Sequence, residues 1–483
     1  MPRTQEATTA MMYAEPTTHE HPRTAGQRII DTFDVLCLIL DRVHDRPSLA
    51  RLARSHTAFF DLCTKRIWAS VDSLRPLVAL LPKHALPVSL WPFSLVESKL
   101  SNDGLCDEDL IRWRIYSPLV KAISLDFCLL GNHAPLRHFW QFKTTHSARL
   151  NELNLDVLSA ILQLRARQGG SILPNLRQAV LKSYTPTVCD TARALGDTNV
   201  TRLCIHKLGF SGNEPEDERS EYSAFHLVAE WRQLKEISIL GNEGTIGARA
   251  TLISTLDPEV SHIESFEVLC KIARSRGLLI ALSKLDLLQK LVIDDTSQNW
   301  PAKMLDDGVL CHAYWRPLSD FLNSHEVKDI LGRNSFARLQ NLTMASTLEF
   351  CAAMVTAVGS QLTSLKIATT LPTTQDLQAL LGAIVRPKGD TNKVLKHLSL
   401  IIRDNKGSFC DSCWCMLYAL RHLDLHSFHL EGRYERDCND YDLADDVVSR
   451  LIFEWPNLSL LHLEIVRQDG WTVYPNFVRR YRA

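Results

Sequence analysis

The stretch ALRHLDLH, residues 419–426, places Leu420, Leu423 and Leu425 at spacings of three and two residues. Two interpretations fit this spacing: one buried strand of an ordinary α/β protein, or one unit of a repeat array. The two interpretations differ in whether the spacing recurs at intervals along the rest of the chain.

The spacing recurs along most of the 483 residues, with any aliphatic residue allowed at each leucine position. Seven further clear copies begin at Leu150, Leu234, Leu288, Leu339, Leu362, Leu395 and Leu458. Four weaker copies begin at Leu119, Leu176, Val200 and Ile263. Successive copies are 23 to 38 residues apart, except for a gap of 51 residues before Leu339, where we expect an insertion or a degenerate repeat. Leucine-rich repeats are about 20 to 29 residues long and open with the same spacing.

Between these copies the apolar residues change to helical spacing. Residues 156–167, 347–358, 373–385 and 443–455 set apolar side chains three and four apart. One strand and one helix cannot bury the leucines of a single unit, but stacked units bury them between one another. Burial of each leucine side chain stabilises the fold by about 1.5 to 3 kcal/mol. The sequence therefore predicts an α/β fold in which residues 116–483 form a leucine-rich repeat solenoid. It would be a horseshoe with a parallel sheet on the concave face and helices on the convex face.

The alternative, a doubly wound α/β enzyme, requires a glycine-rich phosphate loop after a strand. The candidate segment GNEGTIGA, residues 241–248, matches neither a dinucleotide fingerprint nor a phosphate-loop lysine pattern, and we interpret it as a turn.

Residues that alternate with the strand leucines point to the concave face and are free to bind a partner. The candidates for this substrate-binding surface are Asn154, Glu236, Ser238, Glu267, Lys290, Thr343, Lys366, His397, Ser399, His422, Asp424 and His462. They mix both charges with hydroxyl groups and form no basic stripe, so we expect a protein partner and no nucleic acid.

The composition also favours a protein that binds other proteins and neither nucleic acid nor membranes. The formal net charge of −1 and the isoelectric point near 7.0 give no overall attraction to nucleic acid or to an anionic membrane. No apolar run is long enough for a membrane span. The thirteen cysteines are odd in number and follow no signal peptide, which indicates reduced thiols in the cytoplasm or nucleus. Residues 1–28 lack an apolar segment and are expected to form a disordered leader.

No sequence motif indicates catalysis. Cys410, Cys413 and Cys415 lie close together, but a zinc site needs a second ligand pair at a suitable spacing, and only Cys438 lies nearby. We interpret the three as structural thiols, with zinc as the alternative. HExxH, GxSxG and paired acid–base carboxylates are all lacking, so we expect no catalytic residues, no metal and no cofactor.

Residues 29–72 lack the leucine spacing and are predicted to form three helices. Leu36, Ile39, Leu40 and Val43 form a helical stripe, and Pro47 suits the start of the next helix. A module this short needs further support from the repeats or from a partner. Residues 73–115 are predicted to be a helical linker.

The module resembles the F-box, particularly that of F-box proteins from basidiomycete fungi. The resemblance is carried by the order of DVLCLIL (34–40), SLARLAR (48–54), AFF (58–60) and IWASV (67–71). SLRPLVALLP (73–82), DLIRWRIYSPLVKAISL (109–125) and EWPNLSLLHL (454–463) are also similar to phrases of that family.

The resemblance implies a substrate-recognition subunit of a Skp–cullin–F-box ubiquitin ligase. The F-box would bind a Skp-family adaptor, and through it a cullin-RING ligase, while the repeats bind an unknown target protein. The residues that would face the adaptor, or stiffen the surface that does, are Leu36, Ile39, Leu40, Leu49, Leu52 and Trp68. The alternative is a non-catalytic repeat scaffold with no ligase partner, in which these residues pack internally.

The last segment, GWTVYPNFVRRYRA (470–483), offers no closing helix. We therefore expect the final repeat to be poorly capped or the chain to be shortened.

Overall fold

The chain divides into two compact units, Met1–Ser70 and Val71–Ala483. The computed structural model describes residues 32–81, 108–126, 158–159, 161–162, 164–166, 171–182, 186–196, 199–206, 224–240, 252–256, 262–269, 276–294, 331, 336–358, 361–370, 374–385, 394–403, 415–434, 441–467 and 472–480. The expected leader, the segment GNEGTIGA, Cys410 and Cys413 all lie outside these residues.

Three helices make up the described part of the first unit: α2 (Phe33–Asp41), α3 (Arg46–Ser55) and α4 (Thr57–Ala69). The Asp45 carboxylate caps α3 by accepting a hydrogen bond of 2.8 Å from the Ser48 amide, and a proline stands in the first turn of that helix. The α2 helix buries Leu36 and Leu40. The two-residue strand β1 (Ser70–Val71) lies at the boundary between the units.

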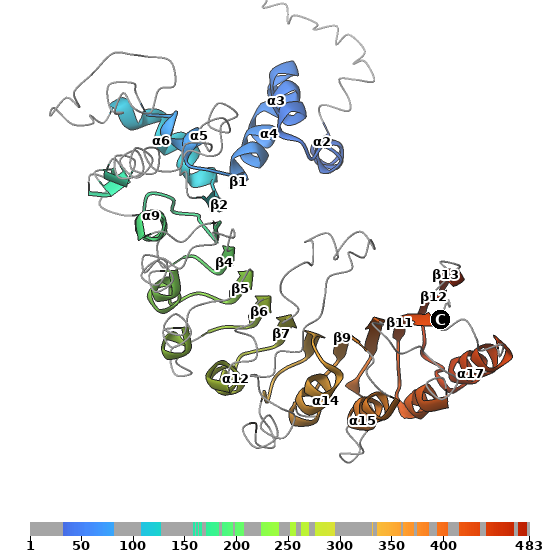
Figure 1. Cartoon of the computed structure of the whole chain (residues 1–483). Coiled ribbons are helices and arrows are strands. Elements are labelled where there is room, and N and C mark those ends of the chain that lie inside the picture. The colour runs from blue at the N-terminus through green and yellow to red at the C-terminus, as the bar shows by residue number, and fades with distance from the viewer. Residues whose placement is uncertain are drawn as a thin grey trace, which may run out of the picture. The chain divides into compact units, whose positions relative to one another are not determined.

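The second unit is built around one sheet whose strands follow the order of the sequence (Figure 1). Its strands are β2 (Ala122–Leu125), β3 (Gln178–Leu181), β4 (Arg202–His206), β5 (Glu236–Leu240), β6 (Ser265–Leu269), β7 (Lys290–Asp294), β8 (Asn341–Ala345), β9 (Ser364–Thr370), β10 (His397–Arg403), β11 (Ser427–Tyr434), β12 (Leu460–Arg467) and β13 (Thr472–Arg480). All neighbours from β2 to β12 pair in parallel. The prediction of an α/β fold with a parallel sheet is therefore confirmed.

A repeated hydrogen-bond pattern sets the register of these strands. At the start of each strand, two successive amides donate to one carbonyl of the preceding strand unit, over 2.7 to 3.2 Å. The acceptors are the carbonyls of Lys121, Arg177, Thr201, Lys235, Glu264, Gln289, Gln340, Thr363, Lys396 and His426. Because the same local geometry recurs from β2 to β12, each unit is positioned mainly by its neighbour.

Helices lie on one side of the row of strands, as Figure 1 shows. They include α9 (Pro186–Leu195), α12 (Arg276–Ser283), α14 (Leu348–Ala357), α15 (Thr374–Val385) and α17 (Tyr441–Glu454). The last three confirm the helices predicted over 347–358, 373–385 and 443–455. The predicted linker contains α5 (Arg75–Val78), η3 (Glu108–Leu110) and α6 (Ile111–Tyr116), and η4 (Ser117–Leu119) follows it. No helix in the described ranges is both long and apolar enough to cross a bilayer.

The strand expected at ALRHLDLH lies five residues later than predicted. Residues 418–422 form the 3-10 helix η9, and the strand begins at Ser427. The spacing of the motif is repeated there by Leu425, Phe428 and Leu430, all of which are buried. The Lys396 carbonyl fixes this frame because it accepts from the amides of His426 and Ser427. The leucines of the earlier frame are also buried, and the Leu420 carbonyl accepts a hydrogen bond of 3.1 Å from the Trp455 indole.

Two other copies of the spacing differ from the sequence prediction. The copy that begins at Leu150 lies outside the described residues, and β2 pairs directly with β3. The copy placed at Leu119 is displaced by one residue, since Val120, Ile123 and Leu125 are the buried set.

The sheet ends differently from the expectation of a poorly capped repeat. Strand β13 pairs antiparallel with β12, from Leu460 opposite Arg480 to Val466 opposite Thr472. A further strand satisfies backbone groups of β12 that an exposed edge would leave unpaired. The segment forms no closing helix, as expected, but the sequence analysis did not consider that an antiparallel strand could cap the sheet instead.

Candidate functional site

One side of the sheet carries polar side chains in regular rows, and we call it the polar face. Since side chains alternate across a strand, the residues between the buried motif positions share this face. Its middle row runs from β4 to β12 through Cys204, Ser238, Glu267, Val292, Thr343, Lys366, Ser399, His429 and His462. A second row contains Arg202, Glu236, Ser265, Lys290, Asn341, Ser364, His397 and Ser427.

Most residues predicted to bind a substrate lie in these two rows. The middle row contains Ser238, Glu267, Thr343, Lys366, Ser399 and His462, and the second row contains Glu236, Lys290 and His397. Asn154 lies outside the described residues.

The placement of His422 and Asp424 on a strand is wrong, because the true strand starts after them. His422 ends the helix η9 and is exposed. The Asp424 carboxylate accepts hydrogen bonds from Lys396 at 2.6 Å and from Asn457 at 2.8 Å, and these two bonds lower its pKa. It therefore joins neighbouring units, and Ser427 and His429 take the predicted positions.

A sulfur-containing cluster lies on the β4–β6 part of the polar face. Cys204 Sγ is 3.1 Å from His206 Nε2, and the Ser238 hydroxyl donates to Glu267 over 2.8 Å. Burial raises the pKa of the Cys204 thiol to about 11 and lowers the pKa of His206. Both groups are therefore held in their neutral forms, so the pair is not the thiolate–imidazolium pair that makes a cysteine a strong nucleophile.

A histidine-rich cluster lies on the β9–β12 part of the polar face. Ser399 Oγ is 3.1 Å from His429 Nδ1, and the His429 ring stacks on His462 with centroids 4.3 Å apart and planes 14° apart. Burial, followed by the positive charges of His462 and Lys366, lowers the pKa of His429 to about 4. His429 is therefore neutral at physiological pH. The sequence analysis missed it because it placed the strand in the earlier frame, which ends at Leu425, so that residue 429 fell beyond the expected strand.

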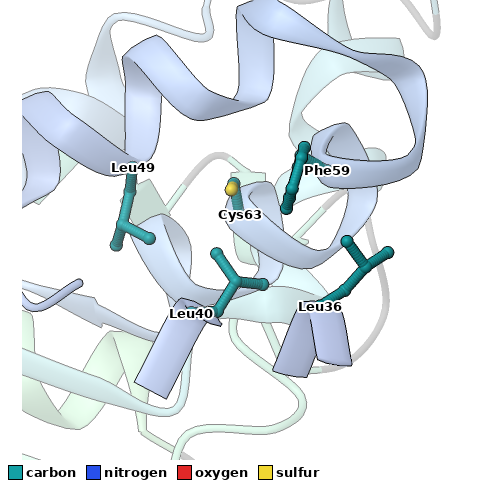
Figure 2. Close-up of a cluster of buried hydrophobic side chains, with 5 residues drawn as sticks. All are labelled: Leu36, Leu40, Leu49, Phe59 and Cys63. Atoms are coloured by element: carbon teal, nitrogen blue, oxygen red, sulfur yellow. The ribbon is translucent and has the colours of Figure 1, made fainter. Parts of the chain in front are cut away.

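In the helical unit, the residues assigned to adaptor binding fall into two groups. Leu36, Leu40 and Leu49 are at most 4% exposed and form a core with Phe59 and Cys63, and Figure 2 shows these five side chains converging. The remaining three, Ile39, Leu52 and Trp68, are half-buried.

Three large apolar side chains of this unit are strongly exposed, and the sequence analysis did not select them. Phe33 and Leu38 of α2 are 61% and 66% exposed, and Phe60 of α4 is 50% exposed. Single exposed apolar side chains are common on protein surfaces, whereas a group of them on one small unit is typical of a surface that a protein partner covers.

The expected cysteine cluster is only partly described. Cys415 is exposed and has a free thiol, while its two predicted companions lie outside the described ranges. Within the described part of the chain, no group of three or more His, Cys, Asp or Glu side chains is arranged to hold a metal ion.

Comparison with known proteins gives no family for this chain. No protein-family model matches the sequence, and none of the curated proteins matches it.

Proposed function

We propose that this protein is a non-catalytic substrate-recognition subunit of a Skp–cullin–F-box ubiquitin ligase, acting in the cytoplasm or nucleus. The helical unit would be an F-box that binds the adaptor. The second unit would be a leucine-rich repeat horseshoe whose concave side is the polar face. The protein would contribute proximity to ubiquitin transfer, because it would hold the target protein near the enzyme that carries ubiquitin.

The observation that carries the proposal is the exposure of Phe33, Leu38 and Phe60 in the segment that resembles the F-box. A core of about five buried side chains is small for an independent fold. Interfaces concentrate their binding energy in a few apolar and aromatic anchors, and burial of these side chains by an adaptor would stabilise both the complex and the unit.

The repeated amide-to-carbonyl pattern from β2 to β12 supports the horseshoe. It recurs where each unit meets the next, as expected when neighbouring units supply most of the stability. The polar face supports target binding, since its rows mix hydroxyl, imidazole and charged groups without a basic stripe.

The test is co-purification of a co-expressed Skp-family adaptor with the wild-type chain and with Leu38→Asp. A charge at this exposed apolar position should reduce the recovered adaptor about tenfold or more, because hot-spot changes cost about 2 kcal/mol or more. The matched control is Phe453→Asp, which also places a charge at an exposed apolar side chain, 86% exposed on α17, and should retain the adaptor.

Leu36→Asp is a less informative test of adaptor binding, because Leu36 is 3% exposed and a buried charge would unfold the helical unit itself. Circular dichroism of each variant separates lost contact from lost structure.

The scaffold interpretation has one observation in its favour: Leu36, Leu40 and Leu49 pack within the unit's own core. Absence of the adaptor from wild-type preparations, with both units folded, would favour the scaffold and contradict the ligase proposal.

A further inference from the structure

The histidine-rich cluster has an unsatisfied polar atom. His429 Nε2 is buried and has no hydrogen-bond partner among the residues that the structure describes, although the ring itself is held on both sides. Ser399 fixes its Nδ1, and His462 stacks on its face. A buried polar atom without a partner costs about 1 to 3 kcal/mol, which a ligand atom would recover by bonding to it.

The chemistry of the missing group follows from the neighbours of His429. The hydrogen bond between Ser399 Oγ and His429 Nδ1 can run in either direction. A ligand that accepts a hydrogen bond from Nε2 selects the tautomer in which the Ser399 hydroxyl donates to Nδ1. Lys366 lies in the same row, one strand beyond Ser399, and its positive charge acts on His429. An acceptor with negative charge satisfies both groups. Glu431, two residues along β11, already has an interaction of its own.

We propose that Lys366, His429 and His462 form a subsite for a carboxylate side chain in an acidic segment of the target protein. The proposal rests on the proposed function, in which the polar face binds the target. It narrows the substrate class to proteins that present an aspartate or glutamate to strands β9–β12.

A carboxylate fits better than a phosphate for reasons of charge. His429 is held neutral mainly by burial. Among the described residues, the positive charges that act on it come from His462 and Lys366, and of these two Lys366 carries the permanent charge. One fixed cation matches a monoanion, whereas phosphate recognition generally uses clusters of arginines.

The experiment selects binders of the purified full chain from a library of short random peptides. The enriched peptide is then resynthesised with Glu, Gln or phosphoserine at its most strongly selected position, and affinities are measured by fluorescence anisotropy. We expect Glu to bind about tenfold or more tightly than Gln, because hydrogen bonds to charged groups contribute about 1.5 to 3 kcal/mol.

Two variants assign the binding to this subsite. Lys366→Gln removes the cation, and His429→Phe keeps a ring that stacks on His462 but removes both nitrogens. Each should lower the affinity of the Glu peptide about tenfold and reduce its preference over Gln. Lys284→Gln is the matched control, since it makes the same change at an exposed lysine directly after helix α12, outside both rows of the polar face, and should leave affinity unchanged. Lys366 is half-buried, so its variant keeps the test valid if His429→Phe fails to fold.

The proposal is overturned if no peptide is enriched, if Gln or phosphoserine binds as well as Glu, or if the two variants bind like the wild type. Adaptor co-purification is measured on the same preparations. Loss of the adaptor with peptide binding intact contradicts the ligase role alone, while the opposite result contradicts the subsite alone.

Discussion

Leu430→Asp should abolish folding of the last repeats, whereas His422→Asp should leave the protein as stable as the wild type. Leu430 is fully buried in β11, and its partners in register are Leu400 and Leu463, each 1% exposed. An aspartate there would be a buried charge among apolar side chains. The expected loss exceeds about 4 kcal/mol, which places it among the most damaging substitutions. His422 is exposed, so the same charge remains in water.

The measurement is urea unfolding followed by circular dichroism, with limited proteolysis to locate the opened segment. The Leu430→Asp protein should be cleaved within residues 395–467 at urea concentrations where the wild type resists. If Leu430→Asp is as stable as the wild type, the strand does not lie at Ser427–Tyr434 and the earlier frame, which ends at Leu425, is correct.

Phe266→Ala should lower the free energy of unfolding by about 3 to 5 kcal/mol, as expected for deleting a fully buried phenylalanine from a packed core. Phe266 is 0% exposed on β6, and its partners in register are Ile237 and Leu291. The cavity left by the missing ring would therefore weaken the packing of β6 against both β5 and β7.

The control is Phe453→Ala, the same substitution at a ring that is 86% exposed on α17. It should change stability by no more than about 0.5 kcal/mol. Urea midpoints of the two variants, measured beside the wild type, give the comparison. Equal shifts would mean that Phe266 is not part of a shared core between strands.

The leucine spacing predicted most of the sheet because the residues that carry it perform two tasks at once. In units such as Leu234–Ile237–Ile239 the same side chains are buried and occupy equivalent register positions in neighbouring strands. Local sequence therefore contains enough information to place those strands.

At ALRHLDLH the predicted strand position was wrong, because two overlapping sets of apolar residues have the same spacing and both are buried. Leu420, Leu423, Leu425 and Leu430 are all at most 3% exposed. The choice is made by hydrogen bonds to the Lys396 carbonyl, which belongs to the preceding unit. A single segment does not contain that non-local information.

The sequence predicts which residues lie on the polar face, but it does not predict which of their side chains contact one another. Alternation with buried positions identified Ser399 and His462 as sharing one face. The stacking of His429 on His462 depends on the register between β11 and β12, and so does the unsatisfied Nε2 atom that it leaves. The exposed Leu38 was missed because the helical stripe of the sequence identifies the buried side of a helix and not the side that a partner covers.

The central claim is that the helical unit binds the adaptor and leaves the polar face free for a target. Hydrogen–deuterium exchange of the full chain, with and without a Skp-family adaptor, tests it most directly. The account predicts adaptor-dependent protection within residues 33–60 and unchanged exchange in strands β9–β12. Protection confined to those strands, or no protection anywhere in the chain, would contradict it.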